Sequence, residues 1–166
     1  ALRTLGVEAE WFVVGEGEER ANLEKLIKDY GVERCFHLLG AKSNPYPYMR
    51  CCDVYVQPSR WEGYGITVAE AKVLCKPIVV SSIPEFKEQI VDRTTGVICD
   101  NEEEMVQGIK QIINNVEFRE QLVENLQKCT YSSEEIKKLE SNKDNVATEI
   151  NKSKSEVDTA KKDTED

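Results

Sequence analysis

Short apolar runs alternate along this chain with segments of helical periodicity, and this alternation limits the fold most strongly. The apolar runs are EWFVV (10–14), CFHLL (35–39), DVYVQ (53–57), PIVV (77–80) and GVIC (96–99). Between the first two, ANLEKLIKDYG (21–31) carries apolar residues three and four positions apart and ends on Gly31, a helix stop signal. Parallel strands need such helical crossovers, which cover both faces of a sheet. The sequence therefore predicts a doubly wound α/β fold with a parallel sheet.

Further helices are expected after the third and fifth strands. TVAEAKVLC (67–75) reads as a helix that ends before Pro77, and residues 102–127 read as two helices divided by the pair NN. The first residues resemble the last turn of a helix that leads into a strand. We therefore expect that the first strand of the domain lies upstream of Ala1.

The residues from Tyr131 onward differ from the rest, because they contain no Gly or Pro and few large apolar residues. This pattern predicts two parts, a folded domain over 1–129 and a polar helical or disordered tail over 130–166. The apolar residues of the tail show an alternating three-four spacing that Lys143 and Ser153 interrupt. A weak coiled coil or docking helix is therefore the alternative to a solvated tail.

Composition restricts the partners and the compartment. A net charge of −9 argues against nucleic acid, which is bound through clustered Lys and Arg. The six cysteines include no C-x-x-C pair and the one histidine is His37, so we expect free thiols and no metal. No basic segment leads into an apolar stretch at the start, and no apolar run approaches the length of a membrane span. We predict a cytoplasmic protein.

A glycine-rich loop follows the third strand, at the edge where doubly wound sheets bind ligands. In SRWEGYG (59–65), Gly63 and Gly65 allow a sharp turn and a close approach of the backbone to a ligand. The helix that opens near Gly65, Ile66 and Thr67 presents unpaired N–H groups with partial positive charge. We expect phosphate at this helix end.

Two carboxylates flank the expected phosphate position. Glu70 lies about one and a half turns into the helix, roughly 7 Å along its axis, which suits a neighbouring sugar such as ribose. Glu62 lies in the loop and would face the other side of the phosphate, so the layout fits a nucleotide sugar. The alternative is that both are solvated or helix-capping acids. The acidic segment Gly15–Gly17 would repel phosphate, and we interpret it as a turn.

The stretch SRWEGYGITVAEAKVLCKPIVV (59–80) resembles the E-x7-E signature of retaining glycosyltransferase family 4, which has the GT-B fold. The signature joins a glutamate, a glycine-aromatic-glycine turn, a second glutamate followed by alanine, and a proline before the next strand. Residues 13–40 and 81–109 resemble the segments on either side of it, and the similarity extends to about Cys129. It implies that residues 1–129 form the Rossmann-like, C-terminal donor-binding half. Cys75 and Lys76 depart from the pattern, because the family often has a glycine there.

The resemblance also implies roles for individual residues. Glu70 would bind the donor ribose, and Glu62, the proposed catalytic residue, would hold a hydroxyl of the transferred sugar. His37 would lie beside the base, although an ordinary strand histidine is the alternative. The backbone amides that would meet the sugar and the diphosphate are those of Tyr64, Gly65, Ile66 and Thr67.

The function implied by the resemblance is hexosyl transfer from a nucleotide-diphosphate sugar to a glycan, lipid or other acceptor, as in polysaccharide biosynthesis, with no metal or other cofactor. Its partners would be the donor and an N-terminal acceptor-binding half upstream of Ala1. Peripheral membrane association of the complete enzyme is compatible with it, as is weak self-association through the tail or open strand edges. The fragment alone is expected to be inactive. The alternatives are a GT-B-like epimerase or phosphorylase and a non-catalytic ligand-binding or interaction module.

Overall fold

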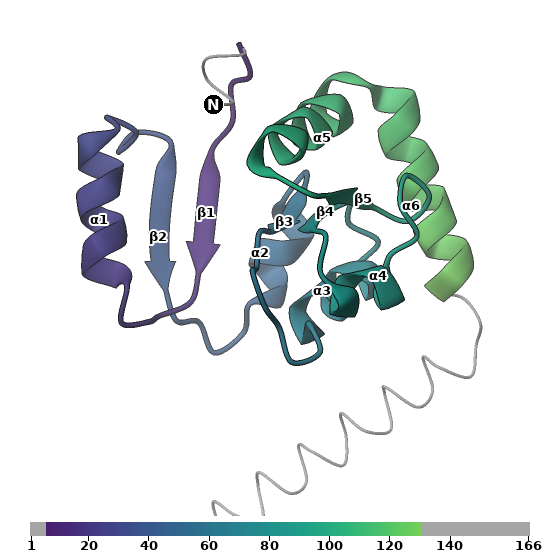
Figure 1. Cartoon of the computed structure of the whole chain (residues 1–166), viewed down its shortest axis with the longest axis horizontal. Coiled ribbons are helices and arrows are strands. Elements are labelled where there is room, and N and C mark those ends of the chain that lie inside the picture. The colour runs from purple at the N-terminus through teal and green to yellow at the C-terminus, as the bar shows by residue number, and fades with distance from the viewer. Residues whose placement is uncertain (1–5, 131–166) are drawn as a thin grey trace, which may run out of the picture. The chain divides into compact units, whose positions relative to one another are not determined.

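The computed structural model describes residues 6–130 and confirms the five predicted strands, which run parallel within two sheets (Figure 1). Their bounds are β1 (Trp11–Val14), β2 (Phe36–Gly40), β3 (Tyr55–Gln57), β4 (Ile78–Ser81) and β5 (Val97–Cys99). β1 pairs with β2, and the second sheet has the order β3-β4-β5. Within the described residues, β1 and β3 each pair on one side, so each leaves one open edge. Open edges expose unpaired N–H and C=O groups.

Helices connect the strands, and the sequence predicted four of the six in the described part of the chain. Their bounds are α1 (Arg20–Asp29), α2 (Tyr46–Cys51), α3 (Ile66–Val73), α4 (Pro84–Gln89), α5 (Glu102–Asn114) and α6 (Val116–Thr130). The sequence missed α2 and α4, which have six residues each and are too short to show a helical period. None of the helices in residues 6–130 is long and apolar enough to cross a membrane.

The chain divides into two units, Ala1–Leu126 and Gln127–Asp166. In the second unit, the structure describes the end of α6 alone. The predicted boundary at 129/130 stays a prediction. The predicted polar tail falls on residues 131–166, and the predicted helix turn at the start falls on 1–5; both lie outside the described residues.

The core of the first unit lies on both faces of β4, whose residues Ile78, Val79 and Val80 are fully buried. Ile78 and Val80 belong to a cluster with buried residues of α2, α3 and α4. Val79 belongs to a second cluster with buried residues of β5, α5 and α6. Successive strand residues point to opposite faces, so this apolar run needs helices on both sides. The prediction that helices cover both faces of a parallel sheet is confirmed.

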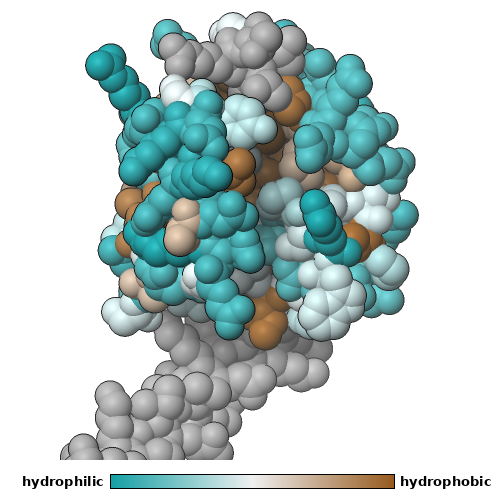
Figure 2. Space-filling view, turned by 60° about the vertical axis from the view of Figure 1, so that its left-hand side comes forward, coloured by the Kyte–Doolittle hydropathy of each residue, from teal (hydrophilic) through white to brown (hydrophobic). Residues whose placement is uncertain are grey.

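α1 confirms the helix predicted over 21–31, but its apolar residues are not buried. It lies beside β2 (Figure 1), yet none of its residues is buried, and Leu26 and the adjoining Tyr30 are 40% and 76% exposed. The physical reason is that its sheet has two strands and offers little surface to cover a helix. Figure 2 shows that apolar residues on this side form separate patches among hydrophilic ones. Scattered exposed apolar residues are ordinary for a protein surface.

The ends of α1 and α3 share one backbone arrangement but differ in sequence. After α1, Gly31 N–H donates to the Lys28 carbonyl at 3.0 Å, and Gly31 has φ +61°. After α3, Cys75 N–H donates to the Lys72 carbonyl at 2.8 Å, and Cys75 has φ +51°. In both, the next N–H reaches back five residues, which completes a Schellman motif. Cys75 therefore adopts the left-handed conformation that glycine accepts without strain.

We predict that Cys75→Gly stabilises the protein. Relief of the left-handed strain exceeds the entropy that glycine gains in the unfolded chain, so we expect a gain of about 0.5 to 1 kcal/mol in the free energy of unfolding. Urea unfolding followed by circular dichroism measures this gain. Cys75→Ala, which removes the thiol but keeps the strain, should bring no gain, and Gly31→Ala should lose stability. A lower unfolding midpoint for Cys75→Gly would contradict the prediction.

Candidate functional site

The loop between β3 and α3 is held from two directions. From the neighbouring strand, the Ser81 hydroxyl donates to the Ser59 carbonyl. From α4, the Gln89 side-chain amide donates to the Tyr64 carbonyl. Gly65 caps α3 with φ +74°, and a Cβ at this position would lie 2.7 Å from a ring carbon of Phe86. The loop therefore turns directly against the core, where a larger residue would not fit.

The first turn of α3 leaves backbone donors free. Val68 and Ala69 donate their N–H groups to the Gly65 carbonyl at 3.0 and 3.2 Å. Within the described residues, the N–H groups of Ile66 and Thr67 have no acceptor. Because helix N–H dipoles add up to a partial positive charge, this end of α3 favours an anion.

Two side chains at the end of β3 and just after it hold Glu62 by hydrogen bonds. Its Oε1 accepts a hydrogen bond from the Ser59 hydroxyl at 2.6 Å and another from the Gln57 side-chain amide at 2.9 Å. Gln57 is the last residue of β3, and its own Oε1 accepts from the Tyr55 hydroxyl at 2.7 Å. These bonds engage one carboxylate oxygen of Glu62. The second oxygen accepts no hydrogen bond among residues 6–130 and is available to a ligand.

Glu70 lies on the second turn of α3, and a tyrosine of α2 holds it. The Tyr46 hydroxyl donates to Glu70 Oε1 at 2.9 Å. This hydrogen bond is the main reason why the pKa of Tyr46 lies above its ordinary value, with burial and the Glu70 charge as further causes. The phenol therefore stays protonated and able to donate throughout the neutral range.

Tyr55 lies close enough to both carboxylates to sense their charges. Burial raises the pKa of Tyr55 above its ordinary value, and a hydrogen bond with Thr67 opposes this shift. The negative charges of Glu70 and Glu62 raise the pKa further. The half-buried Tyr55 hydroxyl thus connects β3 with the first turn of α3, and the charges of both acids affect it. Glu62, Glu70 and the amides of residues 64–67 thus lie on the loop after β3 and on the first two turns of α3, and their common role in binding a ligand stays a prediction.

The two lysines of α3 and the residues after it donate hydrogen bonds to backbone carbonyls outside the loop. Lys72 donates to the Gln89 carbonyl at 2.7 Å, and Lys76 donates to the Cys52 carbonyl at 2.9 Å. Arg60 is exposed within the loop and forms no ion pair within the described residues. Across residues 6–130, no group of His, Cys, Asp and Glu side chains could hold a metal ion. In the part of the chain that the structure describes, the α3 end therefore supplies positive potential to the site, and Arg60 is the one Lys or Arg of the loop itself.

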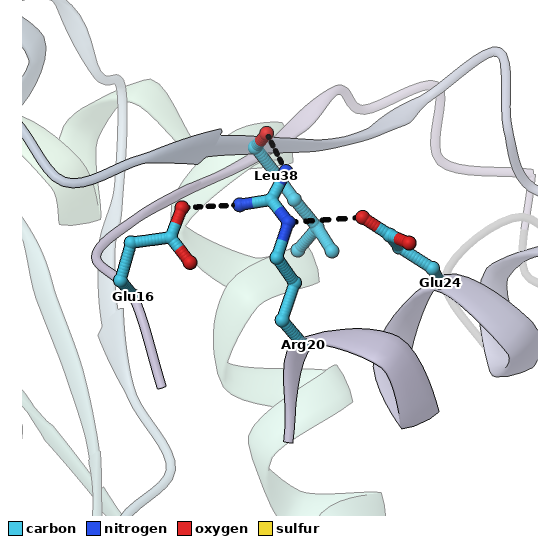
Figure 3. Close-up of polar contacts among 4 residues, drawn as sticks. All are labelled: Glu16, Arg20, Glu24 and Leu38. Carbon is cyan, nitrogen blue, oxygen red and sulfur yellow. Dashed lines mark hydrogen bonds and ion pairs between the residues drawn. The ribbon is translucent and has the colours of Figure 1, made fainter. Parts of the chain in front are cut away.

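A turn follows β1, but it spans residues 17–20, just after the predicted segment Gly15–Gly17, because Arg20 N–H donates to the Gly17 carbonyl at 3.1 Å. The Arg20 guanidinium contacts Glu16 at 2.5 Å and Glu24 at 2.9 Å, and it also reaches the Leu38 carbonyl at 3.5 Å (Figure 3). Arg20 is therefore engaged by two carboxylates. Such partly exposed pairs add little stability, so their effect is to fix the loop between β1 and α1.

His37 lies near the start of β2, whereas ligands bind beyond the carboxyl ends of parallel strands. Its ring stacks on Phe12, with ring centres 4.9 Å apart, and its Nε2 lies 3.9 Å from a Glu10 carboxylate oxygen. These contacts are with β1 and the residue before it, rather than with the loop that carries Glu62. A role of His37 beside the base stays a prediction.

Sequence reasoning missed the side chains that hold the two carboxylates. Gln57 and Ser59 stand next to the glycine-rich loop, so their position after a strand was a usable signal. The sequence offered no such signal for Tyr46 and Gln89, because each lies on a helix too short to show a helical periodicity. The missed residues are Tyr46, Tyr55, Gln57, Ser59, Ser81 and Gln89.

Residues 1–129 match the family described as glycosyl transferases group 1. The chain is 29% identical over 128 residues to alpha-D-kanosaminyltransferase of Streptomyces kanamyceticus, which covers 75% of this chain and 33% of that protein. The structure also resembles the Anabaena protein HepE in complex with UDP-glucose, with a TM-score of 0.68 and 22% identity over 73% of this chain and 35% of the other. This likeness shows a GT-B, Rossmann-like fold. The chain spans about a third of the length of each of these proteins.

We predict that Gln57→Leu destabilises the protein by about 1 kcal/mol, because it leaves the half-buried Tyr55 hydroxyl without its acceptor and Glu62 without one donor. Urea unfolding measures the loss. Gln121→Leu, at an exposed position of α6, is the matched control and should change stability by less than about 0.5 kcal/mol. Equal effects of the two substitutions would show that the Gln57 hydrogen bonds contribute nothing.

Proposed function

Because this chain belongs to the glycosyl transferases group 1 family, we propose that residues 1–129 form the donor-binding half of a retaining glycosyltransferase. The donor is a nucleotide-diphosphate sugar, and the acceptor is a glycan, a lipid or another hydroxyl compound. One observation carries this proposal. Two carboxylates, each held by hydrogen bonds from other side chains, stand four residues before and four residues after Ile66, where the free N–H groups open α3.

The diphosphate binds at the amino end of α3 in this proposal. The free N–H groups of Ile66 and Thr67 donate to its oxygens, and Tyr64 and Gly65 provide the neighbouring backbone. The helix end also offsets the repulsion between the diphosphate and the two acids. No metal is assigned to this half.

The two carboxylates bind the sugars on either side of the diphosphate. Glu70 accepts hydrogen bonds from the ribose hydroxyls, and Glu62 uses its second oxygen to accept one from the transferred sugar. During transfer, the anomeric C–O bond to the diphosphate breaks as an acceptor hydroxyl oxygen attacks from the same face, and the hydroxyl proton passes to the leaving diphosphate. Glu62 therefore orients the sugar and is not the covalent nucleophile. His37 stays a candidate contact for the base.

We predict that Glu70→Gln and Glu62→Gln weaken different ligands. Titration calorimetry with UDP and with UDP-glucose measures both affinities. Glu70→Gln should weaken UDP by roughly 1 to 3 kcal/mol, because it removes a charge-assisted hydrogen bond to ribose. Glu62→Gln should leave UDP unchanged and weaken the intact donor.

The control for this pair is Glu88→Gln, an exposed carboxylate of α4 outside the site, which should change neither affinity. If Glu70→Gln binds UDP as tightly as the parent chain, Glu70 does not hold the ribose. If Glu62→Gln weakens UDP and UDP-glucose equally, Glu62 does not contact the transferred sugar.

We also predict that the 166-residue chain alone is not a competent transferase. Transfer needs an oriented acceptor and a neutralised leaving group, and the described site supplies one helix end for this work. Incubation with UDP-glucose and simple sugar acceptors, followed by assay of released UDP, tests this prediction. Turnover of about 1 per second or more, typical of enzymes, would contradict it.

A further inference from the structure

The hydrogen bond between Tyr46 and Glu70 joins α2 and α3, which β3 and the glycine-rich loop separate in the sequence. Tyr46 is the first residue of α2, and Glu70 lies 24 positions further along, on α3. We propose that Tyr46 is a positioning residue that fixes the Glu70 carboxylate for the two ribose hydroxyls. This inference rests on the proposed function and deepens it, because it names the group that sets ribose recognition.

The structure presents the Tyr46 hydroxyl from a constrained turn. The Asn44 side-chain oxygen accepts the Tyr46 backbone N–H at 3.1 Å, and proline residues stand on both sides of Tyr46. One turn later, Met49 is buried in the cluster that contains Val68 and Ala71 of α3. Because α2 and α3 share this core, the separation between the Tyr46 ring and Glu70 is set by packing rather than by the hydrogen bond itself.

Glu70 keeps most of its acceptor capacity after it binds Tyr46. An ionised carboxylate has about four acceptor sites, and Tyr46 occupies one of them on Oε1. Within the described residues, Oε2 accepts no hydrogen bond, so it and the second site of Oε1 are free for ribose. Without Tyr46, a partly exposed glutamate would sample several rotamers, and the ligand would have to restrict them on binding.

The Tyr46 ring has a small structural role, because 42% of this residue is exposed. Tyr46→Phe keeps the ring and removes the hydroxyl, so the fold should persist. Tyr48→Phe is the matched control. Tyr48 lies on the same helix at 41% exposure, its ring contacts Lys42, and its hydroxyl has no hydrogen-bond partner within the described residues.

The test compares UDP with 2′,3′-dideoxy-UDP, which lacks both ribose hydroxyls, by titration calorimetry on the full chain. The parent chain should prefer UDP. Tyr46→Phe should weaken UDP about three- to tenfold, the range expected for one hydrogen bond, and should leave the dideoxy compound within about twofold. Tyr48→Phe should change neither affinity. In a Glu70→Ala background, Tyr46→Phe should have less than about a twofold further effect on UDP.

Two results for Tyr46→Phe would overturn the proposal. Unchanged UDP affinity would show that Glu70 needs no positioning, and equal weakening of both ligands would show a general structural role instead of a ribose-specific one. A parent chain that binds both ligands equally, or binds neither, would instead refute the ribose assignment of Glu70. The Tyr46 proposal would then be wrong as well. The measurement on the parent chain alone separates this outcome from a failure of the Tyr46 proposal by itself.

Discussion

The close contact between Phe86 and Gly65 is the constraint on which the site depends. Phe86 is fully buried, and its ring occupies the space that a side chain at position 65 would need. Gly65 therefore combines a left-handed backbone with contact to the core, which glycine alone permits. Gln89, one turn beyond Phe86, donates a hydrogen bond to the carbonyl of Tyr64, the residue before Gly65. The packing of α4 thus sets where α3 begins and where its free N–H groups lie.

The two carboxylates have different supports, and this separates their roles. Glu62 is held by polar side chains at the end of β3, whereas Glu70 is held by Tyr46 from α2. Each acid has one oxygen engaged by the protein and one open to a ligand. Both charges contribute to raising the pKa of Tyr55, after the larger effect of burial. Binding of an anion there depends on the α3 dipole, which offsets the two negative charges.

Much of the fold followed from local sequence patterns. The apolar runs predicted the five strands, and apolar residues three and four positions apart, followed by Gly31, predicted α1 and its end. The strand, glycine turn and helix that carry Glu62 and Glu70 were also predicted, since these elements follow one another directly in the sequence. The short helices α2 and α4 were missed because one and a half turns carry too little periodicity. The exposure of α1 was missed because it depends on how many strands its sheet contains.

The sequence by itself determined the order of strands and helices, the position of the glycine turn and the two acids beside it, because these features depend on neighbours along the chain. The tertiary structure alone decided which side chains hold those acids. Tyr46 reaches Glu70 across 24 positions, and Gln89 reaches Tyr64 across 25, through the packing of helices that share a core cluster. Contacts between residues so far apart depend on the three-dimensional packing of the whole unit, which no local pattern of residues encodes.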